Sequence, residues 1–398
     1  MMQWLARTGS RVPPHWRYAL LVFAVSRVAL SLLGILVRQA LEGAGVGPPS
    51  AEAQMLQDQA AVSPHVWYSM WFAWDAFQYR DLAEVPWGGW THTGFPLLFP
   101  VLAKAVAVPL GGDTELALLL ISAAAYVVLL SYLYRWTLLV LGDSGGPDDH
   151  ATARRACRYL ALMPAGFLFH APLTESLFVC LAVAAFYHAE RRQWLLVGVI
   201  GYFLSMSRSV GFLVVVPLAM LLLRERGYRL GPRALLAHLR AGWPLLLVPA
   251  GWLTFMAYSR WRVGDWFDYQ NEQRRGWQIE PQSPLRTIWT GLCEEVAPID
   301  RTRLYVALVV LAIAVAGLWW LHPAYAVYTV LLVLASMTIG PVVYRSLLRY
   351  LLVAFPLAAV LAGATAGRER DTAFTAVLAG TQGVLFALWI AYWTHTVI

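Results

Sequence analysis

Residues 18–37 read YALLVFAVSRVALSLLGILV, an apolar run in which Arg27 is the only charged residue. An α-helix rises 1.5 Å per residue, so this run is roughly 30 Å long as a helix, which matches the hydrocarbon core of a bilayer. Arg7, Arg11 and Arg17 precede it. The run is longer than the apolar core of a signal peptide, which also ends at a small-residue cleavage site. We therefore expect a retained membrane span with the N-terminus in the cytoplasm.

The composition of the whole chain agrees with a membrane protein. Its 398 residues are 59% hydrophobic and 13% charged, and the mean hydropathy is +0.56. Soluble proteins carry about 25% charged residues, so too few charges are present here to cover a water-facing surface. The figures exclude a soluble enzyme, a disordered chain and a disulfide scaffold. The use of arginine in place of nearly all lysine, together with abundant Ala, Gly and Val, suggests a GC-rich genome and hence a bacterium.

Further apolar runs follow along the chain, at residues 115–140, 157–171, 173–189, 194–207, 209–223, 241–259, 304–321, 323–340, 347–366 and 373–396. We expect about eleven membrane spans, or nine if 157–189 and 194–223 are each a single helix. Residues 95–110 contain three prolines and Lys104, and predict a short interfacial or re-entrant helix rather than a span. The predicted fold class is an all-α polytopic membrane protein, a single domain over residues 1–398 with no separate soluble domain.

The arginines favour one threading of the chain through the membrane. If 95–110 does not cross, the cytoplasmic segments collect Arg154, Arg155, Arg191, Arg192, Arg224, Arg226, Arg229, Arg233, Arg240, Arg368 and Arg370, as the positive-inside rule requires. The same rule accounts for the net charge of +7, so we expect no nucleic-acid partner. Two external loops result, at 42–110 and 260–303. If 157–189 and 194–223 each form a helical hairpin, Arg191 and Arg192 stay on the cytoplasmic side. We therefore prefer hairpins to single helices for these two runs.

The first external loop contains the stretch WFAWDAFQYRDLA at residues 71–83. In a helix, one face would carry Trp71, Trp74, Asp75, Gln78, Tyr79 and Leu82. An aromatic face of this kind places a helix in the membrane interface. Asp75 is then a carboxylate on an apolar face, which suits a general base. The alternative is a helix cap or an ion pair with a nearby arginine.

Three more charges lie beside apolar runs: Glu175 in HAPLTES, Arg208 in SMSRSVG and Arg349 in YRSLLRY. Charges at membrane depth are unfavourable and are usually retained for function. The alternative is that they pair with one another or extend to the interface. The histidines and acidic residues show no metal-ligand spacing, so we expect no structural metal. We expect no cofactor, and a requirement for a divalent metal is left open. No phosphate-binding loop or dinucleotide fingerprint is present, which argues against a nucleotide-driven pump.

One carboxylate and several arginines on the external side suit the transfer of a sugar from a lipid phosphate. The leaving phosphate needs positive charge, which arginine supplies in a bidentate geometry. The acceptor hydroxyl needs one base, the role open to Asp75. Hydrolysis of a glycoside would need two facing carboxylates. The rival interpretation is a secondary transporter or lipid flippase; such proteins often show inverted repeats, and none is evident here.

Seven fragments, in the same order along the chain, resemble the PIG-V type (GPI mannosyltransferase 2-like) family of GT-C membrane glycosyltransferases and its bacterial homologues. They are Ser26-Arg27, WDAFQYRDLA at 74–83, GFPLLFPVL at 94–102, MPAGFLFHAPLTESLF at 163–178, SRSVGFLVVVPL at 207–218, GDWFDYQNEQRRGW at 264–277 and RYLLVAFPL at 349–357. The turn EVPWGGWTHTGFP at 84–96 departs from the family pattern, with Trp90 and His92 in place of the usual Gly-Tyr and acidic turn.

The resemblance implies a GT-C fold and an inverting transfer of mannose from a polyprenyl-phosphate (dolichyl-phosphate-like) donor to a hydroxyl of a lipid-linked or extracytoplasmic glycan. It implies Asp75 as the catalytic base and Arg208 and Arg349 as contacts to the donor phosphate. Substrate contacts are expected at Trp74, Tyr79, His170, Glu175 and Gln270. The expected partners are membrane lipids, the donor and the acceptor. The expected location is the bacterial plasma membrane with the site on the extracytoplasmic face, or the endoplasmic reticulum in a eukaryote.

Overall fold

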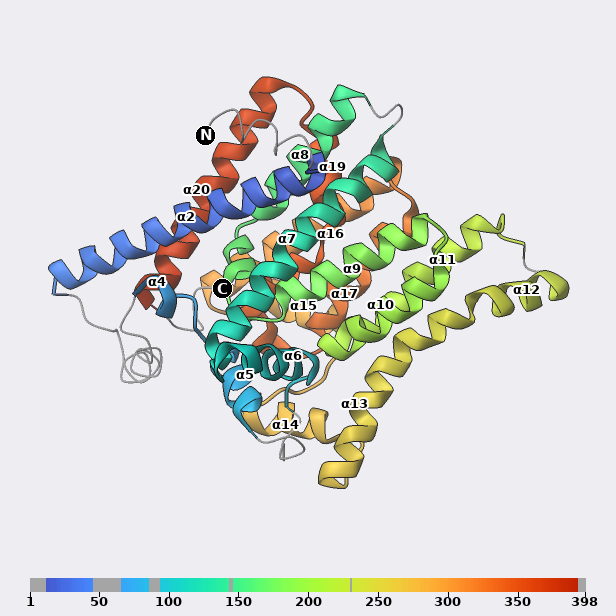
Figure 1. Cartoon of the computed structure of the whole chain (residues 1–398), viewed down its shortest axis with the longest axis horizontal. Coiled ribbons are helices and arrows are strands. Elements are labelled where there is room, and N and C mark those ends of the chain that lie inside the picture. The colour runs from blue at the N-terminus through green and yellow to red at the C-terminus, as the bar shows by residue number, and fades with distance from the viewer. Residues whose placement is uncertain (1–11, 46–65, 86–93, 143–145, 230, 393–398) are drawn as a thin grey trace.

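The computed structural model describes residues 12–45, 66–85, 94–142, 146–229 and 231–392, and all regular secondary structure in these ranges is helical (Figure 1). This confirms the predicted all-α fold class. The α-helices are α2 (Pro14–Gly43), α4 (Val66–Ser69), α5 (Asp75–Glu84), α6 (Leu98–Ala107), α7 (Thr114–Leu141), α8 (Pro147–Ala161), α9 (Glu175–Glu190), α10 (Trp194–Ser207), α11 (Val215–Glu225), α12 (Pro232–Gly242), α13 (Leu247–Val263), α14 (Asp268–Trp277), α15 (Pro284–Cys293), α16 (Pro298–Ala316), α17 (Pro323–Met337), α18 (Leu347–Tyr350), α19 (Pro356–Ala364) and α20 (Arg368–Tyr392). Short 3₁₀ turns are η1 (Val108–Leu110), η2 (Gly166–His170), η3 (Ser209–Val214), η4 (Trp243–Leu246), η5 (Gly317–Trp319), η6 (Pro341–Ser346) and η7 (Leu351–Val353).

Five helices of the described chain are long and apolar enough to cross a membrane: Pro14–Gly43, Thr114–Leu141, Arg240–Val263, Pro298–Trp319 and Arg368–Ala391. A sixth is added if Pro341–Val353 and Pro356–Ala364, which meet at 69°, are one bent span. The chain is therefore a multi-pass membrane protein. The expected spans 173–189, 194–207, 209–223 and 323–340 correspond to helices of 11 to 16 residues. The expected span 157–171 overlaps α8 only at residues 157–161, so the number eleven stays a prediction.

Helix α7 lies at the centre of the bundle and α2 at its surface (Figure 1). More than half of the most apolar part of α7 is buried, and the helix packs against α2, α6, α8 and α9. Only 11% of the corresponding part of α2 is buried. Its outward side chains are Leu20, Leu21, Val25, Val28, Leu32 and Leu36. A continuous apolar face of this size is expected to contact lipid.

Neither of the two runs left open by the sequence is a single helix. Residues 157–189 contain the end of α8 and the whole of α9, separated by a 3₁₀ turn and by Pro164 and Pro172. Residues 194–223 contain α10 and α11, separated by η3. Arg208, at this second break, has extended torsions (φ −153°, ψ 146°). Each run is thus broken near its middle or its start, and whether it crosses the membrane once or twice stays a prediction.

The helix of the first external loop begins later than its periodicity predicts. Helix α5 begins at Asp75, so Trp71 and Trp74 precede it and do not share a helical face with Tyr79. Asp75, Gln78, Tyr79 and Leu82 keep the predicted spacing within α5, and of these Gln78 is exposed while Tyr79 and Leu82 are buried. The cause of the late start is Trp74, whose positive φ of 52° does not allow the helix to continue backwards. Residues 46–65 and 86–93, with Trp90 and His92, lie outside the described residues.

The segment 95–110 forms a short helix, as predicted. Helix α6 and turn η1 together run from Leu98 to Leu110, too short to cross a bilayer. Lys104 Nζ donates to Ala83 O at 3.1 Å and also to Val85 O. The ammonium group thus caps carbonyls at the C-terminus of α5, where positive charge is favourable, and ties α6 to α5.

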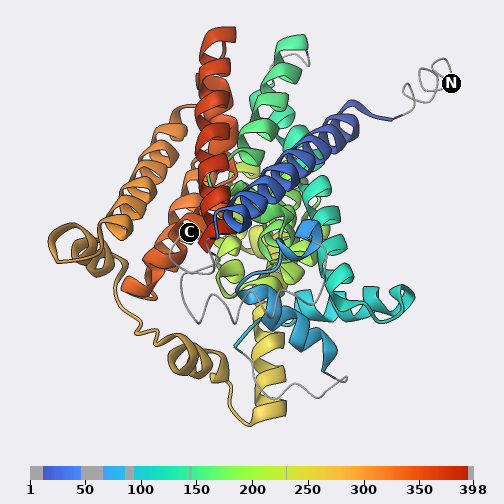
Figure 2. The same ribbon diagram turned by 90° about the vertical axis from the view of Figure 1, so that its left-hand side faces the viewer.

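The segment 260–303, which the sequence predicts to be the second external loop, contains α14 and α15. Figure 2 shows this part of the chain, coloured yellow to tan, wrapped around one side of the bundle between α13 and α16. Helix α14 is attached to the residues before α6: Gln273 Nε2 donates to Gly94 O at 2.7 Å, and the rings of Phe95 and Trp277 lie 5.2 Å apart. These contacts place α14 beside the start of α6.

Candidate active site

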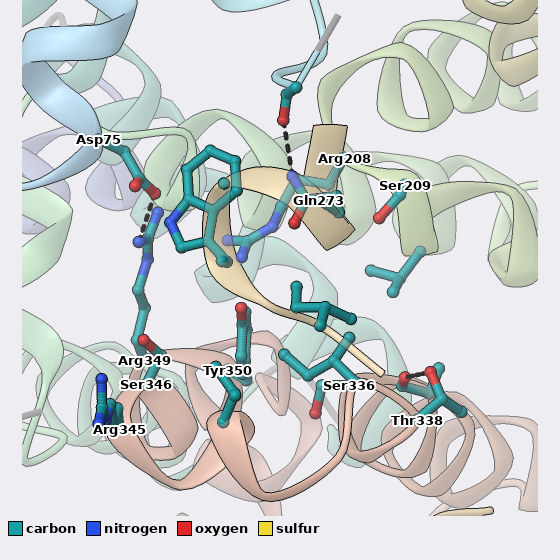
Figure 3. A pocket seen from close by; sticks show the side chains of 18 of the residues that line it. Asp75, Arg208, Ser209, Gln273, Ser336, Thr338, Arg345, Ser346, Arg349 and Tyr350 are labelled. Atoms are coloured by element: carbon teal, nitrogen blue, oxygen red, sulfur yellow. Dashed lines mark hydrogen bonds and ion pairs between the residues drawn. The ribbon is translucent and has the colours of Figure 1, made fainter. Parts of the chain in front are cut away.

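A cavity of about 940 Å³ lies where α5, α14, the break after α10 and the segment around Arg349 meet (Figure 3). Its lining includes six of the eight residues singled out from the sequence: Trp74, Asp75, Tyr79, Arg208, Gln270 and Arg349. These residues come from segments far apart in the chain. The fold therefore brings most of the predicted site residues around one space.

Two carboxylates and two arginines form a continuous ionic network in the wall of this cavity. Arg349 Nη1 donates to Asp75 Oδ2 at 2.6 Å, a contact drawn in Figure 3. Arg349 Nε donates to Glu175 Oε1, and Arg208 Nη1 donates to the same oxygen at 2.7 Å. The order is Asp75–Arg349–Glu175–Arg208. The alternative that these charged residues pair with one another is therefore what the structure shows, and the pairs lie in one wall of the cavity.

The members of the network differ in their access to the cavity. The side chain of Glu175 is 1% exposed and that of Asp75 is 23% exposed. Glu175 therefore lies behind the arginines, and Asp75 faces the open space. A buried charge is tolerated when it is paired, and Glu175 Oε1 has two arginine partners, although Oε2 has none among the described residues. The geometry gives Glu175 a supporting contact with the arginines rather than one with the cavity contents.

All four charged residues lie at helix ends or breaks. Asp75 and Glu175 are the first residues of α5 and α9, where free N–H groups and the helix dipole favour negative charge. Arg208 lies between α10 and η3. Arg349 lies in α18, a single turn flanked by η6 and η7. Because the breaks interrupt apolar segments, they place charged side chains together inside the fold.

The backbone immediately before Asp75 is strained. Trp74 has φ 52° and ψ −120°, torsions that bulky residues rarely adopt and that cost about 1–3 kcal/mol. The indole of Trp74 meets that of Trp389 on α20 edge-on at 6.2 Å. Such strain persists where the surroundings hold the residue, and it is concentrated at functional sites. Here it turns the chain so that Asp75 starts a helix at the cavity.

His170 is the residue singled out from the sequence that lies away from the cavity. Its ring is 1% exposed and packs against the rings of Phe23, Trp71 and Tyr126. Its Nε2 lies 2.9 Å from Ser26 Oγ, and its backbone oxygen accepts from Arg27 Nη1 at 2.9 Å. The structure thus gives the His170 ring a packing position, not the substrate contact that the sequence suggested.

Four tyrosines line the cavity: Tyr79, Tyr269, Tyr344 and Tyr350. Burial raises the pKa of Tyr269 to about 12, and its hydroxyl donates to Ser209 Oγ at 3.2 Å. Burial also raises the pKa of Tyr79, and the nearby Asp75 carboxylate adds to the effect. Both hydroxyls therefore stay protonated at neutral pH and can donate hydrogen bonds. Gln270 Oε1 is buried with no hydrogen-bond partner among the described residues, so a bound hydroxyl could satisfy it.

Two arginines of the cavity lining, Arg274 and Arg345, were not among the predicted site residues. Both are exposed, and neither forms a salt bridge within the described part of the chain. The further carboxylate in the lining, Asp300, is paired with Arg303 at 2.9 Å. The cavity thus carries more positive than negative charge. The sequence could have pointed to both arginines by their spacing from predicted site residues. Arg345 is four residues before Arg349, and Arg274 is four residues after Gln270.

The arrangement can hold an anionic group and accept a proton beside it. The arginines supply charge and N–H donors, and Asp75 supplies an accessible carboxylate oxygen. Among the residues the structure describes, no three His, Cys, Asp or Glu side chains come together in a group that could hold a metal ion.

Fold and cavity together define a multi-pass membrane protein with a charged site built from helix ends. No known family profile matches the sequence, and no curated protein is similar to it. Among solved structures, similar ones are of the oligosaccharyltransferase of Archaeoglobus fulgidus. The form tethered to an acceptor peptide has a TM-score of 0.47 at 11% identity, over 93% of this chain and 55% of that one. The form named AglB, in complex with an inhibitory peptide and a dolichol-phosphate, has a TM-score of 0.49 at 13% identity, over 93% and 56%. The chain spans about half the length of these structures.

Proposed function

We propose that this protein is a membrane glycosyltransferase that moves a sugar from a polyprenyl-phosphate donor to a hydroxyl acceptor, with inversion at the anomeric carbon. The observation that carries the proposal is the Asp75–Arg349–Glu175–Arg208 network in the cavity wall. It leaves one carboxylate accessible and keeps arginines beside it. Transfer from a lipid phosphate needs this combination of a base and fixed positive charge.

In the proposed reaction the acceptor oxygen attacks the anomeric carbon while the bond from that carbon to the phosphate oxygen breaks. The phosphate leaves with the bonding electron pair, and the acceptor proton passes to Asp75. Arg349 occupies Oδ2 of Asp75, so Oδ1 is the oxygen that takes the proton. Arginine has five N–H donors, so Arg208 and Arg349 keep donors for the departing phosphate beyond those given to Glu175 and Asp75.

Transfer agrees with the geometry better than hydrolysis does. A glycoside hydrolase needs two carboxylates that face the sugar. Glu175, the other carboxylate of the network, has a side chain that is 1% exposed and held by two arginines. Asp300, the further carboxylate of the lining, is paired with Arg303 at 2.9 Å. The proposed role of Glu175 is to position Arg208 and Arg349. Trp74, Tyr79 and Gln270 line the cavity and are the proposed contacts to the sugar.

The finer assignments rest on the sequence. The proposed sugar is mannose and the proposed acceptor is a lipid-linked or extracytoplasmic glycan, because WDAFQYRDLA and HAPLTES resemble the PIG-V type motifs. The proposed location is a bacterial plasma membrane with the site on the extracytoplasmic face, since the preferred threading puts the loop arginines on the other side.

The test is a transfer assay with the purified protein in proteoliposomes. A panel of radiolabelled polyprenyl-phosphate sugars is offered with a lipid extract of the host, and the products are separated by chromatography. We expect label to move from one donor into a new product. Asp75→Asn removes the base while keeping the side-chain shape, so it should lower turnover by about two to four orders of magnitude.

The matched control is Asp81→Asn, the same substitution on the same helix at a side chain that is 58% exposed and paired with Arg80. It should retain transfer. Near-normal turnover in folded Asp75→Asn would contradict the assignment of the base. Label that crosses the bilayer chemically unchanged would instead identify a lipid flippase.

A further inference from the structure

Helix α15 presents three large apolar side chains outward. Leu285, Trp289 and Leu292 are 74%, 63% and 38% exposed. Their spacing of four and three residues puts them on one helical face. The opposite face carries Thr287 and Gly291, both buried. The helix is therefore amphipathic with its larger apolar side chains on the outside, the reverse of the pattern in a soluble protein.

The inner face of α15 is fixed to the rest of the fold. Thr287 Oγ1 donates to Met337 O at 2.8 Å, and the hydroxyl of Tyr344 donates to Thr287 O. At Gly291 an added Cβ would lie 2.5 Å from Leu304 Cδ2, so a larger residue would force the Leu304 side chain or the helix to shift, and Gly291 marks a close approach to α16. Because both contacts are on the inner face, the apolar stripe of α15 cannot turn inward.

The contact with α16 also gives the depth of α15 relative to the membrane. Gly291 meets Leu304, and Leu304 begins the apolar part of α16. The residues just before it are polar or charged, with Asp300, Arg301 and Arg303 in the first turns of the helix. A change from charged to apolar residues along a membrane span marks the boundary between headgroups and hydrocarbon. Helix α15 therefore lies at that boundary.

We infer that α15 is an interfacial helix whose stripe of Leu285, Trp289 and Leu292 contacts the lipids of one bilayer leaflet. The partner is a lipid surface, which suits a stripe of leucine and tryptophan at headgroup depth, where tryptophan is enriched. Only residues 294–297 separate α15 from the membrane helix that begins at Pro298. The stripe thus continues the lipid-facing surface of α16, on which Tyr305, Val306 and Val309 are also exposed.

The position of α15 has a consequence for the cavity. Ile279 and Pro281, before α15, and Val296 and Ala297, after it, all line the cavity. Helix α15 connects these two lining segments. Because α15 is held in the membrane interface, it fixes this wall of the cavity at the level of the lipid headgroups. A phosphate carried by a membrane lipid lies at the same level. This consequence holds for any lipid-linked ligand and does not depend on the glycosyltransferase proposal.

The test is site-directed spin labelling in liposomes. Leu285→Cys, Trp289→Cys and Leu292→Cys are each made with Cys293→Ser, because Cys293 is the exposed cysteine while Cys157 and Cys180 are buried. Collision rates are measured with oxygen, which concentrates in the bilayer, and with a water-soluble nickel chelate. Controls are Arg286→Cys with Cys293→Ser, and the native Cys293; these two residues share one flank of α15 and are exposed.

We expect the ratio of oxygen to nickel collisions to be at least several-fold higher at the three stripe positions than at the two control positions. Equal nickel access at all five positions would show that the stripe faces water and would overturn the inference. Strong dipolar broadening between labels on different copies, with both reagents excluded, would show that a second copy covers the stripe and would overturn it equally. Every variant must elute from a sizing column as the unmodified protein does.

Discussion

At the scale of single residues, Arg349 separates two carboxylates that would otherwise repel each other. Its Nη1 reaches Asp75 and its Nε reaches Glu175. Glu175 in turn holds Arg208, so removing the Glu175 charge leaves Arg208 without its carboxylate partner in the network and leaves Arg349 with Asp75 alone. The side chain that is furthest from the cavity is therefore the one on which the arrangement of both arginines depends.

We expect Glu175→Gln to lower the free energy of unfolding by about 3–5 kcal/mol, because it leaves buried arginine charge without its partner. Thermal or denaturant unfolding in detergent measures the change. Asp81→Asn is the control, since it breaks a surface pair with Arg80 and should cost at most about 1 kcal/mol. Equal effects of the two substitutions would mean that the buried network does not stabilise the fold.

Arg27 lies on α2 and joins the two turns that lead to the carboxylates. Its Nη1 donates to His170 O at 2.9 Å, and its guanidinium lies 4.1 Å from the centroid of the Trp71 ring. Asp75 follows Trp71 by four residues and Glu175 follows His170 by five. A change at Arg27 should therefore alter how Asp75 and Glu175 are placed, without removing any group from the cavity.

We expect Arg27→Leu to lower kcat of the proposed transfer by about tenfold or more, with a smaller change in the donor KM, since a 1 Å misplacement of reacting groups has effects of this order. Arg27→Lys keeps a cation over Trp71 and should recover part of the rate. Arg17→Leu, at an exposed arginine of the same helix, is the control. A loss of kcat that only follows the folded fraction would refute a positioning role.

The site residues could be recognised from the sequence, but their contacts could not. A charge beside an apolar run is unfavourable in a membrane and is usually retained for function. This is why Asp75, Glu175, Arg208 and Arg349 could be singled out. That Asp75 and Arg349 touch across a separation of 274 residues depends on packing that no local pattern records. His170, which only the family resemblance indicated, lies in the core, because Ser26 and three aromatic rings from other segments surround it.

At the scale of helices, apolar runs locate most elements, while their ends depend on torsions that periodicity does not reveal. The stretch 71–83 has helical spacing, but the helix begins only at Asp75 because Trp74 is in the positive-φ region. The segment 260–303 has the polarity of a loop and still contains α14 and α15. The apolar side chains of these two helices face other helices, the cavity or, as we infer for α15, lipid. The sequence pattern alone does not show which of these each side chain faces.

Helix α10 packs through glycine contacts against α13 and against the turn η4 that precedes α13, which gives a prediction about stability. A Cβ at Gly251 would lie 2.1 Å from Tyr202 O, and one at Gly198 would lie 2.3 Å from Pro244 O. The nearest atoms are backbone and cannot move aside without moving a helix. We expect Gly251→Ala to destabilise the protein by about 1–3 kcal/mol, as overpacking does, measured by thermal unfolding.

The control is Gly380→Ala on α20, where a Cβ meets nothing within 4 Å. It should be neutral or stabilising by roughly 0.5–1 kcal/mol, because alanine is the better helix former. Arg208 follows the end of α10, so Gly251→Ala should also lower activity. Equal stability of the two alanine variants would show that α10 and α13 are not in close contact.

At the scale of the whole molecule, the threading of the chain decides on which side of the membrane the cavity lies. Arg192, in the turn between α9 and α10, and Arg275, on α14, have side chains that are 72% and 68% exposed. The positive-inside rule puts the first in the cytoplasm, together with Arg191. The preferred threading puts the second outside, beside the cavity that α14 lines.

We expect Arg275→Cys, with Cys293→Ser, to react with a membrane-impermeant thiol reagent added to intact cells or right-side-out vesicles. Arg192→Cys in the same background should react only after the membrane is permeabilised, because the preferred threading puts the turn that carries it in the cytoplasm. Mass-tagging followed by gel electrophoresis measures both. Reaction of the two positions from the same side would contradict the eleven-span threading. It would favour the nine-span alternative, in which Arg191 and Arg192 lie on the side of the external loops.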